Sequence, residues 1–158
     1  YSKTSRDGAQ ITTEIVVDLG ATALLTTLKS KDDHHDVIGV DGGGAAYLTQ
    51  LTTAEHGIVT DAEIVCTEAP QGGELDIDLA YNASATLAFD GAGGTDKLVD
   101  SGADYVLGLN KTGTVNDASA QGDYVYLVTG TSSSPTAGAY THGKFVIRIY
   151  GYAVESDL

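Results

Sequence analysis

Sulfur-containing residues are almost absent: the chain has 158 residues, one Cys and no Met. A single Cys cannot form an internal disulfide, so packing must hold the fold together. At this length one domain can bury well over half of the surface that its unfolded chain exposes. Cys66 lies in an apolar segment with no neighbouring base, which favours a buried, unreactive thiol. Because position 1 is not Met, we expect that a leader was removed or that the numbering starts inside a longer product.

Basic residues are scarce, with 8 Lys and Arg against 22 Asp and Glu, for a formal net charge of -14. Such a surface repels nucleic-acid backbones and anionic membranes, so we expect neither as a partner. Long hydrophobic runs are also missing. No segment is apolar enough to cross a bilayer, and the start, YSKTSRDG, lacks the hydrophobic core of a signal peptide.

The composition predicts an all-β protein. The chain has 20 Gly and only two Pro, with many Thr, Val, Ile and Tyr, which is typical of short strands joined by Gly-rich turns. Alternating side chains predict strands at 11–19, 58–67, 123–131 and 144–152, with further strands at 85–89 and 104–109. Segment 21–29 fits a short helix or a strand equally well. We expect a polar N-terminal arm over 1–10, then one domain over 11–158. This domain is predicted to be a two-sheet β-sandwich, jelly-roll-like, with long Gly/Ser/Thr-rich loops.

The segment 62–81, AEIVCTEAPQGGELDIDLAY, combines two strand-like runs with a Pro-Gln-Gly-Gly turn. We interpret it as an antiparallel pair or as a corner between two sheets. After the turn, apolar residues alternate with Glu74, Asp76 and Asp78. Paired carboxylates can hydrolyse glycosides, but that chemistry needs groups that face each other across a cleft. We therefore predict a solvent-facing acidic row that meets cations or a partner's Lys and Arg side chains.

We interpret the other motifs with potentially reactive or ligand-binding residues as structural. Asp32-Asp33-His34-His35-Asp36 holds metal-binding residue types, but it lacks the spacing of a calcium loop, so we predict a solvated charged loop without a metal. Gly42-Gly43-Gly44 lacks the Lys-Ser/Thr of a phosphate loop and predicts a structural turn. The four His residues show no triad spacing. We therefore expect no catalytic residues and no cofactor.

The two ends of the chain supply candidate interface residues. In the final strand, Val146, Arg148, Tyr150 and Tyr152 form an amphipathic face opposite Phe145, Ile147 and Ile149. Tyr and Arg are enriched at protein interfaces. The predicted contact residues are Tyr1, Lys3 and Arg6 in the arm and Arg148, Tyr150 and Tyr152 in the last strand.

Four segments, VIGVDGGGAAYLTQLTTAEHG, EIVCTEAPQGGELDIDL, DYVYLVTG and AGAYTHGKFVIRIYGY, resemble a group of virion structural proteins from tailed phages of marine bacteria. Those proteins combine C-x-E-A-P-x-G-G-x-x-D-I-D-L with a final T-x-G-K-F-x-I-x-x-Y-G-Y strand. The resemblance covers most of the chain from Asp36 onwards. It implies a capsid decoration or cement protein on the capsid exterior, with the major capsid protein as partner and a homo-oligomer, possibly a trimer, as assembly.

Two alternatives belong to other functional classes. A receptor- or glycan-binding module of a head or tail fibre would use loops 90–95 and 110–122, whose Asp and Asn side chains suit hydroxyl groups. Tyr140 is the one aromatic residue that we place in the long loops, which favours the structural role. A secreted surface or filament subunit is the third possibility.

Overall fold

A computed structural model describes residues 1–20, 27–115, 120–132 and 134–154, and nearly all of its regular structure is β-strand. The single helix of this part is α1 (Thr53–His56), and none of its helices is long and apolar enough to cross a membrane. The strands are β1 (Ser2–Asp7), β2 (Gln10–Asp18), β3 (Lys29–Ser30), β4 (Thr49–Gln50), β5 (Ile58–Gln71), β6 (Ile77–Asn82), β7 (Lys97–Val99), β8 (Asn110–Thr114), β9 (Tyr124–Thr129), β10 (Gly138–Ala139) and β11 (His142–Tyr152). The all-β prediction is confirmed.

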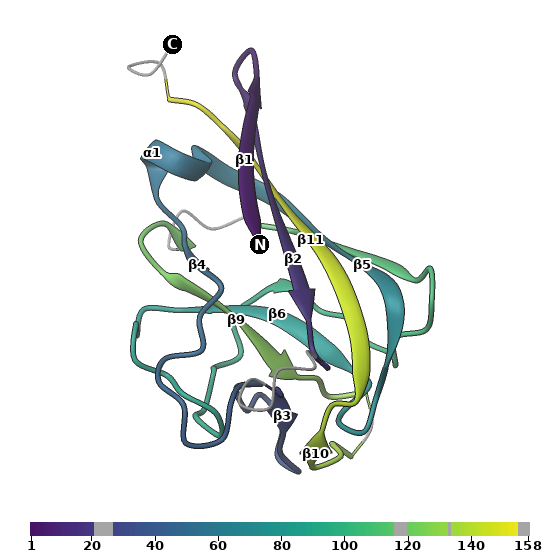
Figure 1. Ribbon diagram of the computed structural model, residues 1–158. Helices are drawn as coiled ribbons and strands as arrows, with labels where there is room; N and C mark the ends of the chain where they lie inside the picture. Colours follow the sequence, from purple (N-terminus) through teal and green to yellow (C-terminus); the bar gives the residue numbers. More distant parts are fainter. Residues whose placement is uncertain (21–26, 116–119, 133, 155–158) are drawn as a thin grey trace.

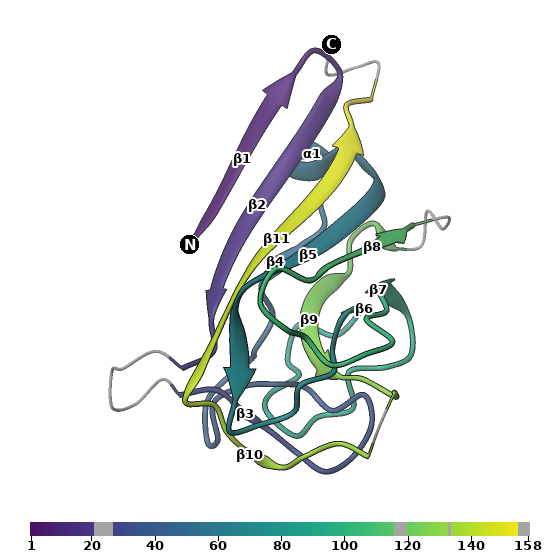
Figure 2. The same ribbon diagram turned by 90° about the vertical axis from the view of Figure 1, so that its right-hand side faces the viewer.

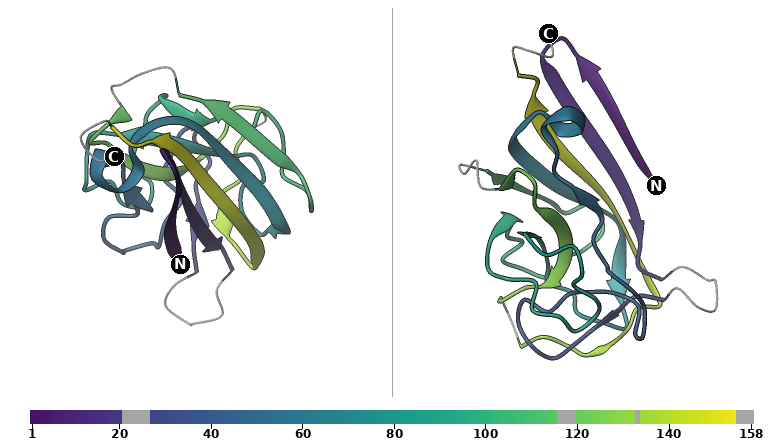
Figure 3. Two further views of the ribbon diagram at one scale, coloured as in Figure 1. Left: turned by 90° about the horizontal axis from the view of Figure 1, so that it is seen from above. Right: turned by 90° about the vertical axis from the view of Figure 1, so that its left-hand side faces the viewer.

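These strands form antiparallel sheets (Figure 1). A five-stranded sheet has the order β1-β2-β11-β5-β8, and a four-stranded sheet has the order β4-β9-β6-β7. A small third sheet pairs β10 with β3. In Figure 2 the hairpin of β1 and β2 lies at one border of the five-stranded sheet, and β11 runs beside it. Figure 3 shows the same hairpin, in purple, from above and from the opposite side.

One hydrophobic core joins the two larger sheets. On β11 the alternation holds as predicted, with Phe145, Ile147 and Ile149 buried. The same core cluster contains Ile77 from β6 and Leu127 from β9. Burying one such aliphatic side chain contributes roughly 2 kcal/mol, so this shared core holds the two sheets together.

The segment 62–81 is a corner between the two sheets. Its first half belongs to β5 in the five-stranded sheet, and its second half continues into β6 in the four-stranded sheet. At the turn, Gly72 has a positive φ of 94°, and a Cβ there would lie 2.3 Å from the carbonyl oxygen of Ala139. Only Gly fits this position, because both the dihedral angle and the close approach exclude a side chain.

The N-terminal residues that we expected as an arm form a strand. β1 pairs with β2 from Ser2↔Ile15 to Asp7↔Gln10, and Gly8 turns the chain between them with a φ of 59°. Every residue of β1 is exposed. Residues 1–10 are therefore one half of a hairpin at the end of the five-stranded sheet.

Two predicted strands are wrong. Segments 85–89 and 104–109 are irregular, because their backbones bond to other parts of the fold instead of to a ladder. Leu87 O accepts from Ala46 N at 2.9 Å, and Tyr105 N donates to Leu75 O at 2.9 Å. Conversely, the polar stretch 110–122 contains β8, and 52–57 contains α1. Most of the ambiguous segment 21–29 lies outside the described residues.

Candidate functional site

The acidic residues after the corner are buried, so the predicted solvent-facing row is wrong. Glu74 is 3% exposed, Asp76 1% and Asp78 0%. The alternation of apolar and acidic residues predicted one solvent-exposed face, but β6 is covered on both faces. Ile77 and Leu79 belong to the main core, while Ala80 packs in a second cluster with Val37 and Val128. We call Glu74, Asp76 and Asp78 the buried acidic row.

Asp78 and Asp76 both contact Ser101, in the segment that follows β7. Asp78 Oδ1 accepts from Ser101 N at 2.7 Å, and its Oδ2 contacts Lys97 Nζ in an ion pair. Asp76 Oδ1 contacts the hydroxyl of Ser101, and its Oδ2 accepts from Ser132 N at 2.7 Å. The two carboxylates therefore fix the positions of segments far along the chain.

Glu74, at the other end of the row, also binds segments that are distant along the chain. Its Oε1 accepts from Asp76 N at 2.9 Å, and its Oε2 accepts from Thr136 N. Its own N–H donates to Ser30 Oγ at 2.8 Å, and its carbonyl oxygen accepts from Tyr140 OH at 2.8 Å. All six carboxylate oxygens of the row thus have a donor within the described chain, as structural carboxylates require.

The hydrogen bonds of Asp76 outweigh its burial. Burial alone would raise the pKa of this carboxyl, but donors from Ser101 and Ser132 and the positive charge of Lys97 hold its pKa below the usual value. Asp76 is therefore a carboxylate whose charge is needed for its contacts. A general acid would need the opposite shift.

The remaining chemical candidates are also engaged in the fold. Within the described residues no group of three or more His, Cys, Asp or Glu side chains is placed to hold a metal ion. In the loop 30–36, His34 Nδ1 lies 2.8 Å from Gly130 O, and Asp36 is buried. His56 is 2% exposed, and its Nδ1 accepts from Thr52 N at 3.2 Å. Cys66 is buried, as predicted, and burial raises the pKa of its thiol.

Four charged residues line up across one face of the five-stranded sheet. Strand register places Lys3 opposite Glu14, Glu14 opposite Arg148, and Arg148 opposite Glu63. Arg148 Nε lies 3.0 Å from Glu14 Oε2, and Arg148 Nη1 lies 2.8 Å from Glu63 Oε1. We call the face that carries this row the outer face. Alternating charges on neighbouring strands support the sheet pairing.

Apolar side chains form the next row of the outer face. Tyr1 and Val16 exchange backbone hydrogen bonds, with Val16 N donating to Tyr1 O at 2.8 Å and Tyr1 N donating to Val16 O at 3.3 Å. Val16 is opposite Val146, which is opposite Val65. Tyr1 is 77% exposed and Val16 36%, so this row lies open beside the charged one.

The structure brings five of the six predicted interface residues onto this face. Lys3 and Arg148 belong to the charged row, and Tyr150 OH donates to Glu63 Oε1 at 2.8 Å. Tyr152 is 50% exposed. Arg6 is the exception, because it is opposite the inward-facing Ile11, and its Nε donates to Gly8 O at 2.8 Å.

One edge of the five-stranded sheet lies along β1. Hydrogen-bonded and non-hydrogen-bonded pairs alternate in an antiparallel ladder. Because Tyr1 is a hydrogen-bonded partner of Val16, Lys3 and Ser5 also bond inwards, and the N–H and C=O groups of Ser2 and Thr4 point away from β2. Such an edge is a template for another strand.

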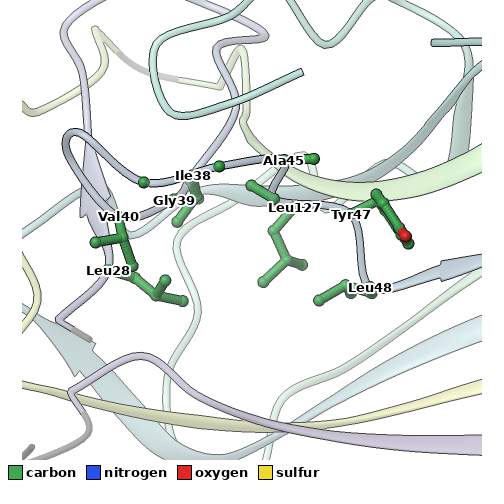
Figure 4. Close-up of a pocket in the computed structure, with 11 residues that line it drawn as sticks. Leu28, Ile38, Gly39, Val40, Ala45, Tyr47, Leu48 and Leu127 are labelled. Carbon is green, nitrogen blue, oxygen red and sulfur yellow. The ribbon is translucent and has the colours of Figure 1, made fainter. Parts of the chain in front are cut away.

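An apolar pocket, which sequence reasoning missed, lies beside the triple-glycine turn (Figure 4). It has a volume of about 390 Å³, and its side chains are apolar apart from the Tyr47 hydroxyl, which points away from the other labelled side chains. The ring of Tyr47 is 5.0 Å from that of Tyr124, centre to centre. Tyr47 is 44% exposed, whereas Tyr140, the loop aromatic that we singled out, is 1% exposed. An isolated Tyr after small residues gives no signal of this pocket.

Comparisons with family models, with curated proteins and with solved structures give no match to this chain.

The charge of Asp76 predicts acid sensitivity. Its pKa is lowered in the folded state, so its contribution to stability is present above the ordinary Asp value of about 3.9 and is lost as the pH falls through the lower folded value. We expect Asp76→Asn to lower the free energy of unfolding by about 3 kcal/mol at pH 7. Urea unfolding should also show a weaker pH dependence below about pH 4 in this variant.

Asp104→Asn is the matched control, because Asp104 is exposed. We expect it to unfold like the parent chain. Equal stabilities of Asp76→Asn and Asp104→Asn at pH 7 would contradict a structural role for the buried acidic row.

Proposed function

We propose that this chain is a non-enzymatic virion structural protein, a decoration protein that bridges major capsid subunits on the outside of a phage head. The observation that carries the proposal is the open edge of β1 next to the outer face. The sequence segments that resemble phage structural proteins add to it. No step of this function requires catalysis, which agrees with carboxylates whose oxygens are all engaged in the fold.

We infer that the two larger sheets are the layers of a jelly-roll sandwich. Leaving out β1 and the short pair β3 and β10, the strands can be counted along the chain as β2, β4, β5, β6, β7, β8, β9 and β11. One sheet then contains the first, eighth, third and sixth of them, and the other contains the second, seventh, fourth and fifth. This order is the winding of a jelly roll, an architecture that capsid and lectin domains use. The core cluster with side chains from both sheets supports the same inference.

The edge of β1 and the outer face form one continuous contact surface in this proposal. A strand from a neighbouring subunit adds to the edge through the backbone groups of Ser2 and Thr4. Tyr1 and Val16 provide exposed apolar area on the adjoining face. Arg148 contributes less than we expected from sequence, because Glu14 and Glu63 already pair with it. Many weak contacts of this kind become stable on a capsid through multivalency.

The pocket beside Tyr47 does not favour the glycan-binding alternative. Recognition of hydroxyl groups needs polar side chains that converge on the ligand. The residues that line this pocket in the described chain include no charged or amide side chain. A secreted filament subunit would use the same sheet edge, so particle composition must separate it from a decoration protein.

The copy number in purified particles tests the proposal. We expect close to one copy of this chain for each major capsid protein, measured by quantitative mass spectrometry of intact virions. A dozen or fewer copies per particle would contradict decoration and support a fibre. Absence from particles would overturn every virion role.

A substitution at the edge tests the contact surface. Thr4→Pro removes an outward N–H and adds a ring at the edge, while the inward hydrogen bonds of Lys3 and Ser5 remain. We expect the variant to bind capsids from which this protein has been removed roughly tenfold more weakly, a change of ~1.4 kcal/mol.

Thr4→Ala is the control, because it keeps the N–H, and we expect it to bind like the parent chain. Deletion of residues 1–10 should reduce occupancy further. Full occupancy by both the Thr4→Pro chain and the deleted chain would rule out the β1 edge as a contact.

A further inference from the structure

Lys97 and Asp78 form a buried amine–carboxylate pair on neighbouring strands. β7 and β6 are antiparallel, with Lys97 opposite Ala80 and a register irregularity next to that position. Lys97 Nζ contacts Asp78 Oδ2 directly. The Lys97 side chain is 11% exposed and the Asp78 side chain 0%. Removing both charges from water is expensive, so this pair differs from an ion pair at the surface.

The other ion pairs between Lys and Asp do not share this environment. Lys29–Asp41, Lys31–Asp90 and Lys144–Asp18 have side chains that are all at least 40% exposed. Water keeps the charges of these pairs separate and their side chains free to move. Asp100 also approaches Lys97, but its oxygen is 3.8 Å away and its side chain is 61% exposed.

Groups suited to acyl chemistry surround the buried pair. Ser101 N donates to Asp78 Oδ1 at 2.7 Å, where negative charge would develop if the carboxyl carbon were attacked. The Ser101 hydroxyl contacts Asp76, a second carboxylate, whose pKa the positive charge of Lys97 helps to lower. Tyr105 OH is buried and has no hydrogen-bond partner in the described part of the chain. Burial and then the charges of Asp78 and Asp76 raise its pKa, so the phenol stays protonated beside the carboxylates.

We propose that Lys97 and Asp78 become joined by an intramolecular isopeptide bond. A proton first passes from the ammonium group to the carboxylate. The neutral amine then attacks Cγ of Asp78, while Ser101 N–H stabilises the oxyanion at Oδ1. The bond from Cγ to Oδ2 breaks, and that oxygen leaves as water with a proton from the amine. The negative charge of Asp76 stabilises the positive charge that this nitrogen carries after the attack. An ammonium and a carboxylate become one amide and one water, without oxidation or reduction.

The product replaces two buried charges by a neutral amide. It links β6 covalently to β7 and closes the chain between residues 78 and 97. This cross-link limits the conformations of the unfolded chain, as other covalent staples do. The inference does not depend on a capsid role, because only Lys97, Asp78 and their neighbours carry it.

Intact-mass spectrometry of the denatured full chain tests the bond. We expect a mass lower than that of the sequence by one water molecule. Tryptic digestion should give one branched peptide that contains both Lys97 and Asp78. A parent chain that keeps its full mass after prolonged incubation in the folded state would overturn the proposal.

Matched variants locate the reaction. Lys97→Arg keeps the positive charge but cannot form the amide, so we expect the full mass, whereas Lys144→Arg should retain the loss of water. A loss of water that persists in Lys97→Arg would contradict the assignment. Asp76→Asn should slow the appearance of the cross-linked mass at least tenfold while circular dichroism still reports a folded chain. Unchanged kinetics in that variant would remove Asp76 from the mechanism.

Discussion

The structure depends on the burial of three carboxylates. Glu74, Asp76 and Asp78 follow the corner at which the chain passes from one sheet to the other. A buried charge without partners costs several kcal/mol, so the segments that supply its donors must be held in place. Three of the residues that supply these donors, Ser101, Ser132 and Thr136, lie outside the strands. The buried acidic row therefore orders the irregular segments at this end of the sheets and leaves the opposite hairpin free to make contacts.

Sequence reasoning succeeded where a strand has one buried face. The alternation in β2 and β11 identified both strands and their inner residues, because hydrophobic burial follows a period of two. It failed for the buried acidic row, because the donors to the carboxylates lie far along the chain: those of Asp78 are 19 and 23 residues away, and those of Asp76 are 25 and 56 residues away. No pattern in the local sequence predicts hydrogen-bond donors that are so distant along the chain. It also failed at 104–109, where tertiary hydrogen bonds replaced a ladder.

The charged residues that stabilise the fold are different from the exposed residues that could contact a partner. Inside the protein, carboxylates bind backbone N–H groups and one Lys. On the outer face, Glu14, Arg148 and Glu63 neutralise one another across three strands. Of the predicted interface residues, Tyr1, Lys3 and Tyr152 remain on an accessible part of that face, whereas Arg148 and Tyr150 mainly support the sheet. The proposed role on a capsid would use this accessible part of the outer face.

Amide hydrogen exchange at Ser101, Ser132 and Thr136 tests most directly whether the buried acidic row organises the fold. These three amides lie in irregular segments, yet each donates to a buried carboxylate. We expect these amides to exchange only through global unfolding, at the same free energy of opening as core amides of β9 and β11. Exchange within seconds at these amides, as in an ordinary exposed loop, would contradict it.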